Sequence, residues 1–316
     1  MNRRLAVVAL WVAANAFAQP YPNKPVRLLV GYAPGGGMDA ISRIVAAKLN
    51  ELTGQAFVVE NRPGALGTLA ADAVVKSAPD GYTLHIGETG LLTVPVFYPS
   101  LAFNPLMSFT PVAGIATLPL AVVVNPDVPA SNATELAAWL KASPGKHSYG
   151  SPGVGSLQHL AMELFNKAIG AQVVHVPYRG AAPMMPDLMS GRLPIGVISV
   201  APALAQARTG KLRTIAVTSP ARIPQAPDWP TLAEFIPRFD AAPRVFLLGP
   251  LGLPDAITAR LAEFARQALA APDVLEGLAK QGASALWCNE RDLAAVMASE
   301  SSKWITVARE AGVKPE

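Results

Sequence analysis

The sequence predicts an α/β fold made of two separate units. Short apolar runs alternate with amphipathic helical segments along most of the 316 residues, and this order predicts parallel strands with right-handed crossovers. A second alternating series starts near Val122, and strands and helices of the same kind return after it. Each series also contains one glycine-rich passage from a strand into a helix, at residues 33–39 and 151–156.

The N-terminal segment has the pattern of a secretory signal peptide. It has a basic start, an apolar run over residues 5–17 and an Ala-Phe-Ala sequence before Gln19. We therefore expect residues 1–18 to be removed and the mature protein to lie in the periplasm. An uncleaved membrane anchor is the alternative, and elsewhere no apolar run reaches the roughly 20 residues of a membrane-spanning helix.

Composition narrows the class of protein. Hydrophobic residues make up 51% of the chain and charged residues 15%, which is enough apolar material for a large core. The net charge of +4 is small and the basic residues are scattered, so we expect no nucleic-acid partner. Cys288 is the single cysteine, which excludes an internal disulfide and is typical of a small, partly buried apolar side chain.

The first series is predicted to contain three strands joined by two helices. The first strand, residues 26–30, leads into a helix over 39–54, in which Ile41 and Val45 share an apolar face. We expect Asp39 to cap the start of this helix, and a glycine at position 54 to end it. The remaining expected elements are a strand at 56–60, a helix at 68–78 and a strand at 82–87.

The second series follows a long apolar run, residues 112–124. This run contains Pro119, and we interpret it as buried strand. The helix expected over 131–145 has Asn132 and Glu135 at the spacing of a capping box. The further strands of this series are expected at 121–124, 146–150, 171–176, 194–199 and 212–219.

A second helix in this series is expected over 156–170, with Ser156 as its N-cap. After it the chain reaches a proline-rich stretch over 220–237, which we interpret as a surface connection near a second crossing between the units. The elements expected beyond this connection are a strand at 244–250, helices at 255–270 and 272–282, a strand at 284–288 and a closing helix at 290–311.

Both glycine-rich loops suit an anion. The first, Ala-Pro-Gly-Gly-Gly-Met-Asp at 33–39, lacks the spacing of a dinucleotide loop or a P-loop, which disfavours a nucleotide site. Glycines let the backbone approach a ligand closely, and free N–H groups at a helix start attract negative charge. One such loop alone is also compatible with a plain tight turn, but the second at 151–156 allows two helix starts to hold one anion. A carboxylate, which accepts about four hydrogen bonds, fits this arrangement.

The sequence gives little support for a metal or a cofactor. His159 and Glu163 stand four residues apart on a predicted helix, but no third ligand is evident, so we expect no metal site. His85, His147 and His175 are dispersed among predicted strands and are interpreted as structural. We expect no cofactor.

An exported serine hydrolase that uses Ser151 or Ser156 with His159 is the enzymatic alternative. The G-x-S-x-G motif is absent and no acid is spaced to orient the histidine, so we expect no enzyme. The roles of two charged residues stay open. Glu88 either lines a pocket or is a solvated loop charge, and Arg179 either meets a second ligand carboxylate or forms an ordinary ion pair.

Several blocks of the sequence together carry a family resemblance. They are YPNKPVRLLVGYAPGGGMDAISR, VVENRPGALGT, SAPDGYTLHIG, YGSPGVGSLQHLAMELF, HVPYRGAAPMMPDLMSGRLP and GKLRTIAVTSPAR. In this order they resemble the periplasmic solute-binding proteins of tripartite tricarboxylate transporters, also called Bug proteins. The resemblance implies a periplasmic-binding-protein (Venus flytrap) fold, in which two α/β lobes joined by crossing strands enclose a ligand cleft. Lobe 1 would comprise residues 19–123 and 244–316, and lobe 2 residues 124–243.

The resemblance also implies site residues and partners. In the family, the two glycine-rich loops hold a ligand carboxylate from both lobes, partly through ordered waters. We therefore expect a monomer that captures a small organic carboxylate and delivers it to the large and small membrane subunits of a transporter. A carboxylate sensor that passes its ligand to a signalling partner is the alternative. The implied ligand-binding residues are Tyr32, Ala33, Pro34, Gly35, Gly36, Gly37, Asp39, Thr89, Ser151, Gly153, Gly155, Ser156, His159, Tyr178 and Gly180.

Three departures from the family pattern concern the distal part of the cleft. Leu66 replaces a glycine that the family usually has, residues 195–204 lack a phenylalanine and an acidic residue common there, and residues 245–250 lack the usual Trp-Gly. These changes imply a distal pocket that is more apolar and less acidic. They favour a hydrophobic or aromatic monocarboxylate, or a small dicarboxylate, over an amino acid.

Overall fold

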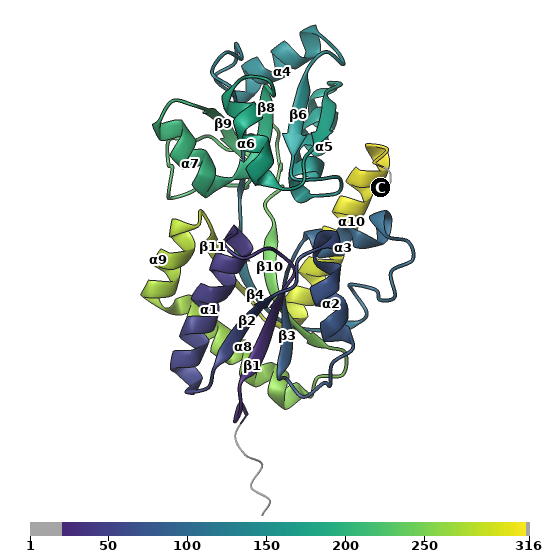
Figure 1. Cartoon of the computed structure of the whole chain (residues 1–316), viewed down its shortest axis with the longest axis vertical. Helices are drawn as coiled ribbons and strands as arrows, with labels where there is room; N and C mark the ends of the chain where they lie inside the picture. The colour runs from purple at the N-terminus through teal and green to yellow at the C-terminus, as the bar shows by residue number, and fades with distance from the viewer. Residues whose placement is uncertain (1–20, 314–316) are drawn as a thin grey trace, which may run out of the picture.

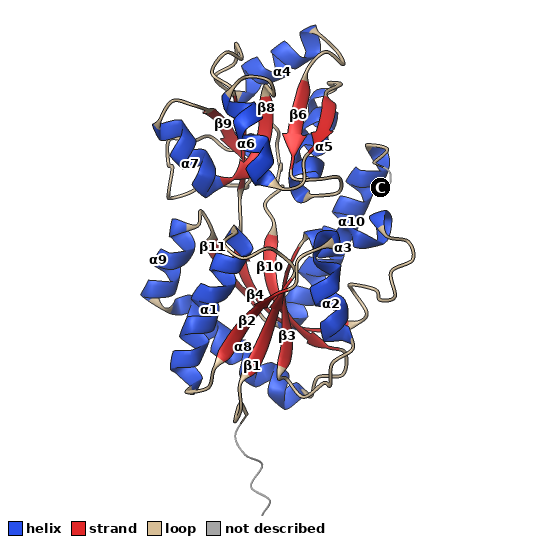
Figure 2. Cartoon of the chain, in the orientation of Figure 1, coloured by secondary structure: helices blue, strands red, loops and turns tan. Residues whose placement is uncertain are grey.

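The computed structural model describes residues 21–313, so the expected signal peptide at 1–18 lies outside the described part of the chain. These residues form two α/β units stacked along the long axis of the molecule (Figure 1). In each unit the strands form one sheet and helices pack around it (Figure 2). The prediction of two α/β units is confirmed. No helix within residues 21–313 has the length and apolar character needed to cross a membrane.

The first unit combines the early and the late parts of the chain. Its strands are β1 (Val26–Val30), β2 (Phe57–Asn61), β3 (Thr83–Glu88), β4 (Phe109–Thr117), β10 (Arg244–Pro250) and β11 (Ser284–Cys288). Its helices are α1 (Gly37–Thr53), η1 (Ala65–Gly67), α2 (Thr68–Val75), α3 (Gly90–Phe97), α8 (Asp255–Ala270), α9 (Pro272–Lys280) and α10 (Glu290–Glu310). The strand order is β11-β4-β10-β3-β1-β2. β1 pairs in parallel with β2 and β3, as predicted, whereas β10 runs antiparallel to β3 and β4.

The second unit is formed by the middle of the chain. Its strands are β5 (Leu120–Val124), β6 (Ser148–Ser151), β7 (Val174–Pro177), β8 (Ile195–Ser199) and β9 (Arg213–Val217). Its helices are α4 (Ala133–Ala142), α5 (Leu157–Ile169), α6 (Ala181–Met189), α7 (Val200–Arg208) and η2 (Leu232–Glu234). The strand order is β7-β6-β8-β5-β9, and β6 is parallel to both β7 and β8 while β5 is antiparallel to its neighbours. Both sheets are therefore mixed.

The first crossing between the units lies between β4 and β5. The apolar run 112–124 is thus two strands in different sheets, and not one buried strand. Pro119 has no N–H to donate to a ladder, and the chain leaves β4 just before it. Residues 120–123, predicted for lobe 1, pair within the second sheet. We propose the two crossings, at 118–119 and 240–243, as the boundaries between the lobes.

The C-terminal helix α10 packs into the cores of both units. Leu293 and Met297 in its first half lie in a cluster with residues of β1, β4 and β10. Trp304 and Val307 in its second half lie in the core around the five-stranded sheet. The helix therefore forms a third connection between the units, in addition to the two crossings.

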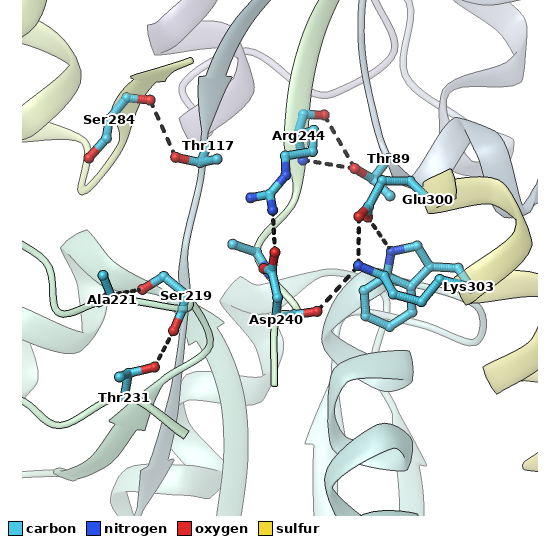
Figure 3. A network of polar contacts seen from close by, with 12 residues as sticks. Thr89, Thr117, Ser219, Ala221, Thr231, Asp240, Arg244, Ser284, Glu300 and Lys303 are labelled. Carbon is cyan, nitrogen blue, oxygen red and sulfur yellow. Dashed lines mark hydrogen bonds and ion pairs between the residues drawn. The ribbon is translucent and has the colours of Figure 1, made fainter. Parts of the chain in front are cut away.

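Polar contacts tie α10 to the second crossing (Figure 3). Lys303 Nζ donates to the backbone oxygen of Asp240 at 3.3 Å and pairs with Glu300 at 2.6 Å. Glu300 also accepts a hydrogen bond from the Trp304 indole N–H at 2.8 Å. Because Asp240 pairs in turn with Arg244 at the start of β10, the crossing is held from both sides.

Some predicted helix boundaries need correction. Gly36, and not Asp39, is the N-cap of α1, since its backbone is extended and its carbonyl accepts the first helical hydrogen bond, from Ala40. The N-caps predicted at Asn132 and Ser156 are confirmed. Three α-helices have no predicted bounds: α3, α6 and α7. α3 is apolar on all sides and contains a proline, so it has no amphipathic period to detect.

Candidate ligand-binding site

In each sheet the parallel strands end at the same edge. The chain also crosses to the other unit at this edge. Val245, near the start of β10 after the second crossing, pairs with Glu88 at the end of β3, and β1 and β2 run parallel to β3. Leu120, which follows the first crossing, pairs with Ser199 at the end of β8, and β6 and β7 run parallel to β8. The loops after these strands therefore face the other unit (Figure 1). Such edges are where open α/β sheets bind ligands.

All residues implied at the site lie on these two edges. Residues 32–37 and Asp39 follow β1, and Thr89 follows β3. Residues 151–156 and His159 follow β6, and Tyr178 and Gly180 follow β7. Their contact with a ligand stays a prediction. Two surface hollows of about 330 and 310 Å³ lie elsewhere, beside the loop after α3 and between α5 and α10, and contain none of these residues.

The loop after β1 is exposed and is braced from within. Residues 33–36 are exposed, and Gly35 has a φ of 82°, which side chains other than glycine adopt at a cost. The buried Asp39 carboxylate accepts from the Gly35 N–H at 2.9 Å and from Asn61 Nδ2 at 2.9 Å, and it pairs with Arg43. Arg43 first, with these hydrogen bonds, lowers the pKa of Asp39 to about 2. Asp39 thus organises the loop, and the exposed backbone of residues 33–36 is left to meet a ligand.

The loop after β6 is held by hydroxyl and histidine side chains. Ser156 Oγ donates to the Gly153 carbonyl at 2.7 Å and accepts from the His159 N–H at 3.3 Å. The Gly155 N–H donates to His159 Nδ1 at 3.1 Å. Gly155 has a φ of 76°, and a Cβ there would lie 2.8 Å from the Phe97 ring at the end of α3. This glycine therefore permits a close contact between the loop and a helix from the first unit.

His175 lies beside two of the implied site residues, Ser151 and His159, which its sequence position does not reveal. Its Nε2 lies 2.7 Å from Ser151 Oγ, and its ring stacks on that of His159 with centroids 3.7 Å apart. Burial lowers the pKa of His159 to about 3 and that of His175 to about 4, so both rings are neutral at pH 7. His175 is therefore not dispersed from the implied site residues, and its interpretation as structural stays a prediction. In the parallel register of β6 and β7, His175 pairs with Tyr149, two residues before Ser151. This pairing brings Ser151 and His175 together although they are far apart in the sequence.

The other two histidines have structural surroundings, as predicted. His85 is buried, and its Nδ1 lies 2.9 Å from the Leu29 carbonyl. His147 stacks on Trp139, with centroids 3.6 Å apart. Within residues 21–313 no three His, Cys, Asp or Glu side chains come together as a possible metal site.

The serine–histidine pair differs from the one that a hydrolase would need. Ser151 contacts His175, and not His159 as the enzymatic alternative requires. Ser156 is occupied as the N-cap of α5. In the described part of the chain, no carboxylate hydrogen-bonds to either ring, so the orienting acid of a catalytic triad is missing there.

The remaining implied residues are held by the backbone. The Tyr178 N–H donates to the Ser151 carbonyl and the Gly180 N–H to the Pro152 carbonyl, both at 3.0 Å, which joins the loops after β6 and β7. The Tyr178 hydroxyl donates to Asp187 at 2.8 Å, and so is directed toward α6. Thr89 is fully buried, and its Oγ1 accepts from the Arg244 N–H at 2.8 Å (Figure 3).

The sequence leaves the roles of two charged residues open, and the structure excludes one of the alternatives for Glu88. Glu88 is buried and accepts a hydrogen bond from the Tyr32 hydroxyl, so it is not a solvated loop charge. Arg179 is exposed on the loop after β7.

Comparisons with known proteins agree with this geometry. The sequence model of the TctC family, described as "Tripartite tricarboxylate transporter family receptor", matches residues 41–313. The chain is 34% identical to Protein BugT of Bordetella pertussis over 99% of both chains. A solved structure of an R. palustris protein with adipate has a TM-score of 0.84 at 32% identity, covering 94% of this chain and 100% of the other. The protein MatC of Rhodopseudomonas palustris with bound malate has a TM-score of 0.78 at 30% identity, covering 91% and 99%.

Proposed function

Since this chain belongs to the tripartite tricarboxylate transporter receptor family, whose members are periplasmic binding proteins and not enzymes, we propose that it captures a small organic carboxylate between its two lobes. It then delivers this ligand to the large and small membrane subunits of a tripartite tricarboxylate transporter. The protein acts as a monomer in the periplasm, after removal of residues 1–18.

One observation carries this proposal: each unit directs a glycine-rich loop and a helix start toward the other unit. The exposed backbone of residues 33–36 precedes α1, and residues 151–156 precede α5. Helix starts favour negative charge by about 0.3–1 kcal/mol each at exposed positions. A carboxylate between the two loops accepts hydrogen bonds from both, so its binding favours the closed arrangement of the lobes.

The ligand class follows from the relatives and from the chain together. One relative has adipate bound and another malate, and both ligands are dicarboxylates. Phe97 and Leu118, both buried, make the packing behind the glycines of the two loops apolar. We therefore favour a small dicarboxylate, with a hydrophobic monocarboxylate as the second class to test.

The test is a thermal-shift screen of the chain from Gln19 onward against carboxylates, amino acids, sugars and phosphates. A ligand that binds only the folded state, at 100 times its Kd, stabilises the protein by about 2.7 kcal/mol. We expect a clear rise in Tm with one or a few carboxylates, adipate and malate being the first two. A rise with phosphates or sugars alone would contradict the proposal.

A further inference from the structure

A buried carboxyl group lies directly behind the loop after β1. Glu88, the last residue of β3, is 9% exposed and accepts a hydrogen bond from the Tyr32 hydroxyl. Its other oxygen, Oε2, is buried and has no hydrogen-bond partner within the described residues. An ionised carboxylate has about four acceptor sites, and leaving one oxygen of a buried ion unpaired is costly. The surroundings therefore suit a neutral carboxyl group better than a charged one.

Among residues 21–313, no ion pair compensates a negative charge on Glu88. His85 on the same strand is buried and neutral, since burial lowers its pKa to about 4. On β10, Arg244 pairs with Asp240, and on α10 Lys303 pairs with Glu300 (Figure 3).

The helices that pack against β3 offer no free cation either. Lys76, at the end of α2, pairs with Asp72, and α3 contains no titratable residue. On α1, beside the loop after β1, Arg43 pairs with Asp39. Burial is the largest influence on the pKa of Glu88 and raises it, while the Tyr32 hydroxyl and the Gly90 N–H oppose this more weakly.

We propose that Glu88 carries a proton in the folded protein at neutral pH, and that this proton links carboxylate binding by the loop after β1 to pH. The linkage rests on the proposed function, whereas the protonation of Glu88 does not. Glu88 is thus a positioning residue that acts through Tyr32 and the loop, because its own oxygens are buried.

Two physical effects connect the proton to the ligand. A charged Glu88 would place a buried negative charge next to Tyr32 and the start of α3, where it repels a carboxylate held by the adjacent loop. A charged Glu88 also uses the single proton of the Tyr32 hydroxyl. A neutral Glu88 can instead donate its own proton to the Tyr32 oxygen, which reverses this hydrogen bond and frees the phenolic proton for another acceptor. Both effects favour the anionic ligand when Glu88 is protonated.

The direction of the pH dependence follows. Below the raised pKa of Glu88 in the folded protein the group is neutral, and affinity for the carboxylate is highest. As the pH rises through that pKa, affinity falls, by up to about tenfold per pH unit if one proton is linked to binding. Any proton that Glu88 gains on binding comes from solvent and returns to solvent on release.

The first measurement needs no ligand. Infrared spectra of the chain from Gln19 onward, recorded at neutral pH, would be compared with those of Glu88→Gln and of the control Glu60→Gln. Glu60 is a charged partner of Arg27, which lowers its pKa. We expect the band of a protonated carboxyl group in the wild type and in Glu60→Gln, and its loss in Glu88→Gln. Should Glu88→Gln not fold, Tyr32→Phe is the second variant, because removing the hydroxyl should shift this band without abolishing it.

The second measurement uses adipate and malate as probes, and any further carboxylate found in the screen. Calorimetry in buffers of different ionisation enthalpy counts the protons taken up per ligand. At pH values above the raised pKa of Glu88 we expect proton uptake and an affinity that falls with rising pH in the wild type, and an affinity that does not depend on pH in Glu88→Gln. The proposal would be overturned if Glu88→Gln lost no infrared band relative to the wild type, or if the two proteins had the same pH profile. If the band is present but no carboxylate binds, the proposed function and the linkage are overturned, while the protonation of Glu88 is still supported.

Discussion

Single residues hold both loops in shape without any contribution from a ligand. Asp39 fixes the loop after β1 through Gly35 and Asn61, and Ser156 fixes the loop after β6 through Gly153. A loop fixed in this way loses little conformational freedom when it binds, which favours affinity. Asp39 is charged and Ser156 is neutral, so substituting them should have different consequences.

Gly155 offers a test of the contact between the loop after β6 and α3. Gly155→Ala should lose about 1–2 kcal/mol of stability from its left-handed backbone, plus the cost of moving the Phe97 ring. Gly170→Ala is the matched control, because Gly170 is also left-handed, with a φ of 68°, but a Cβ there meets nothing within 4 Å. Urea denaturation and ligand titration measure both variants. Only Gly155→Ala should lose affinity for the carboxylate, and equal behaviour of the two would contradict the role given to this contact.

Asp39→Asn tests the brace of the first loop. Hydrogen bonds to a buried charged group contribute about 1.5–3 kcal/mol, so we expect a loss of that size at neutral pH. The pKa of Asp39 is lowered from 3.8 to about 2, so its stabilising effect is present above pH 3.8 and disappears as the pH falls through 2. The difference in unfolding free energy between wild type and variant should therefore shrink over that interval.

The control for this variant is Asp72→Asn. Asp72 pairs with Lys76 on the surface of α2 at 2.6 Å, in a contact of little energetic weight. We expect a change below about 0.5 kcal/mol and no comparable dependence on pH. A pH-independent gap between the wild type and Asp39→Asn would show that Asp39 acts through its shape and not through its charge.

At the same scale, the sequence indicated the loops but not the groups behind them. The glycines and the N-cap Ser156 have local signals that a sequence reveals. His175 reaches Ser151 only through the pairing of β6 with β7, and Glu88 meets Tyr32 only through the pairing of β1 with β3. Strand order is a property of the whole sheet, so neither contact could be predicted from spacing.

At the scale of elements, prediction succeeded where a helix or strand carries its own boundary signal. The strands at 244–250 and 284–288 and the helix at 255–270 have the predicted bounds. The run 112–124 failed, because its division between two sheets depends on where the chain crosses and not on local hydrophobicity. Helix α10 was predicted as an element, but its packing into both units was not.

Trp304 provides the test of that shared helix. It is fully buried in the core of the second unit, and its indole N–H donates to Glu300. Trp304→Ala should cost about 3–5 kcal/mol, measured by urea denaturation. The control is Trp287→Ala on β11, where the side chain is 38% exposed and should cost much less. A small effect at Trp304 would mean that the second half of α10 is not essential to the second unit.

At the scale of the whole molecule, two crossings and α10 limit how the lobes can move. The second crossing, α10 and α3 meet in one polar network, in which Thr89 and Lys303 contact Arg244 and Asp240 (Figure 3). Thr89 lies at the edge that faces the second unit. In the proposed function, closure of the lobes on a ligand must be accommodated by this network, which would connect the implied site to the second crossing.

Asp240→Asn tests this connection. The substitution keeps the shape of the side chain but removes its charge opposite Arg244, whose side chain is 15% exposed. A less restrained crossing lets the unliganded lobes sample more arrangements, so the closed one has a smaller share. We therefore expect carboxylate binding to be several-fold weaker and compaction at a fixed ligand concentration to be smaller. Titration calorimetry measures the first effect and small-angle X-ray scattering the second.

The matched control for this hinge variant is Glu263→Gln. It removes one negative charge from an exposed pair with Arg266 on α8, which is remote from the crossing, so affinity and compaction should stay at wild-type values. Weaker binding in Asp240→Asn with unchanged compaction would place the effect in the site and not in the hinge. Equal weakening in both variants would show that the network at the second crossing does not control closure.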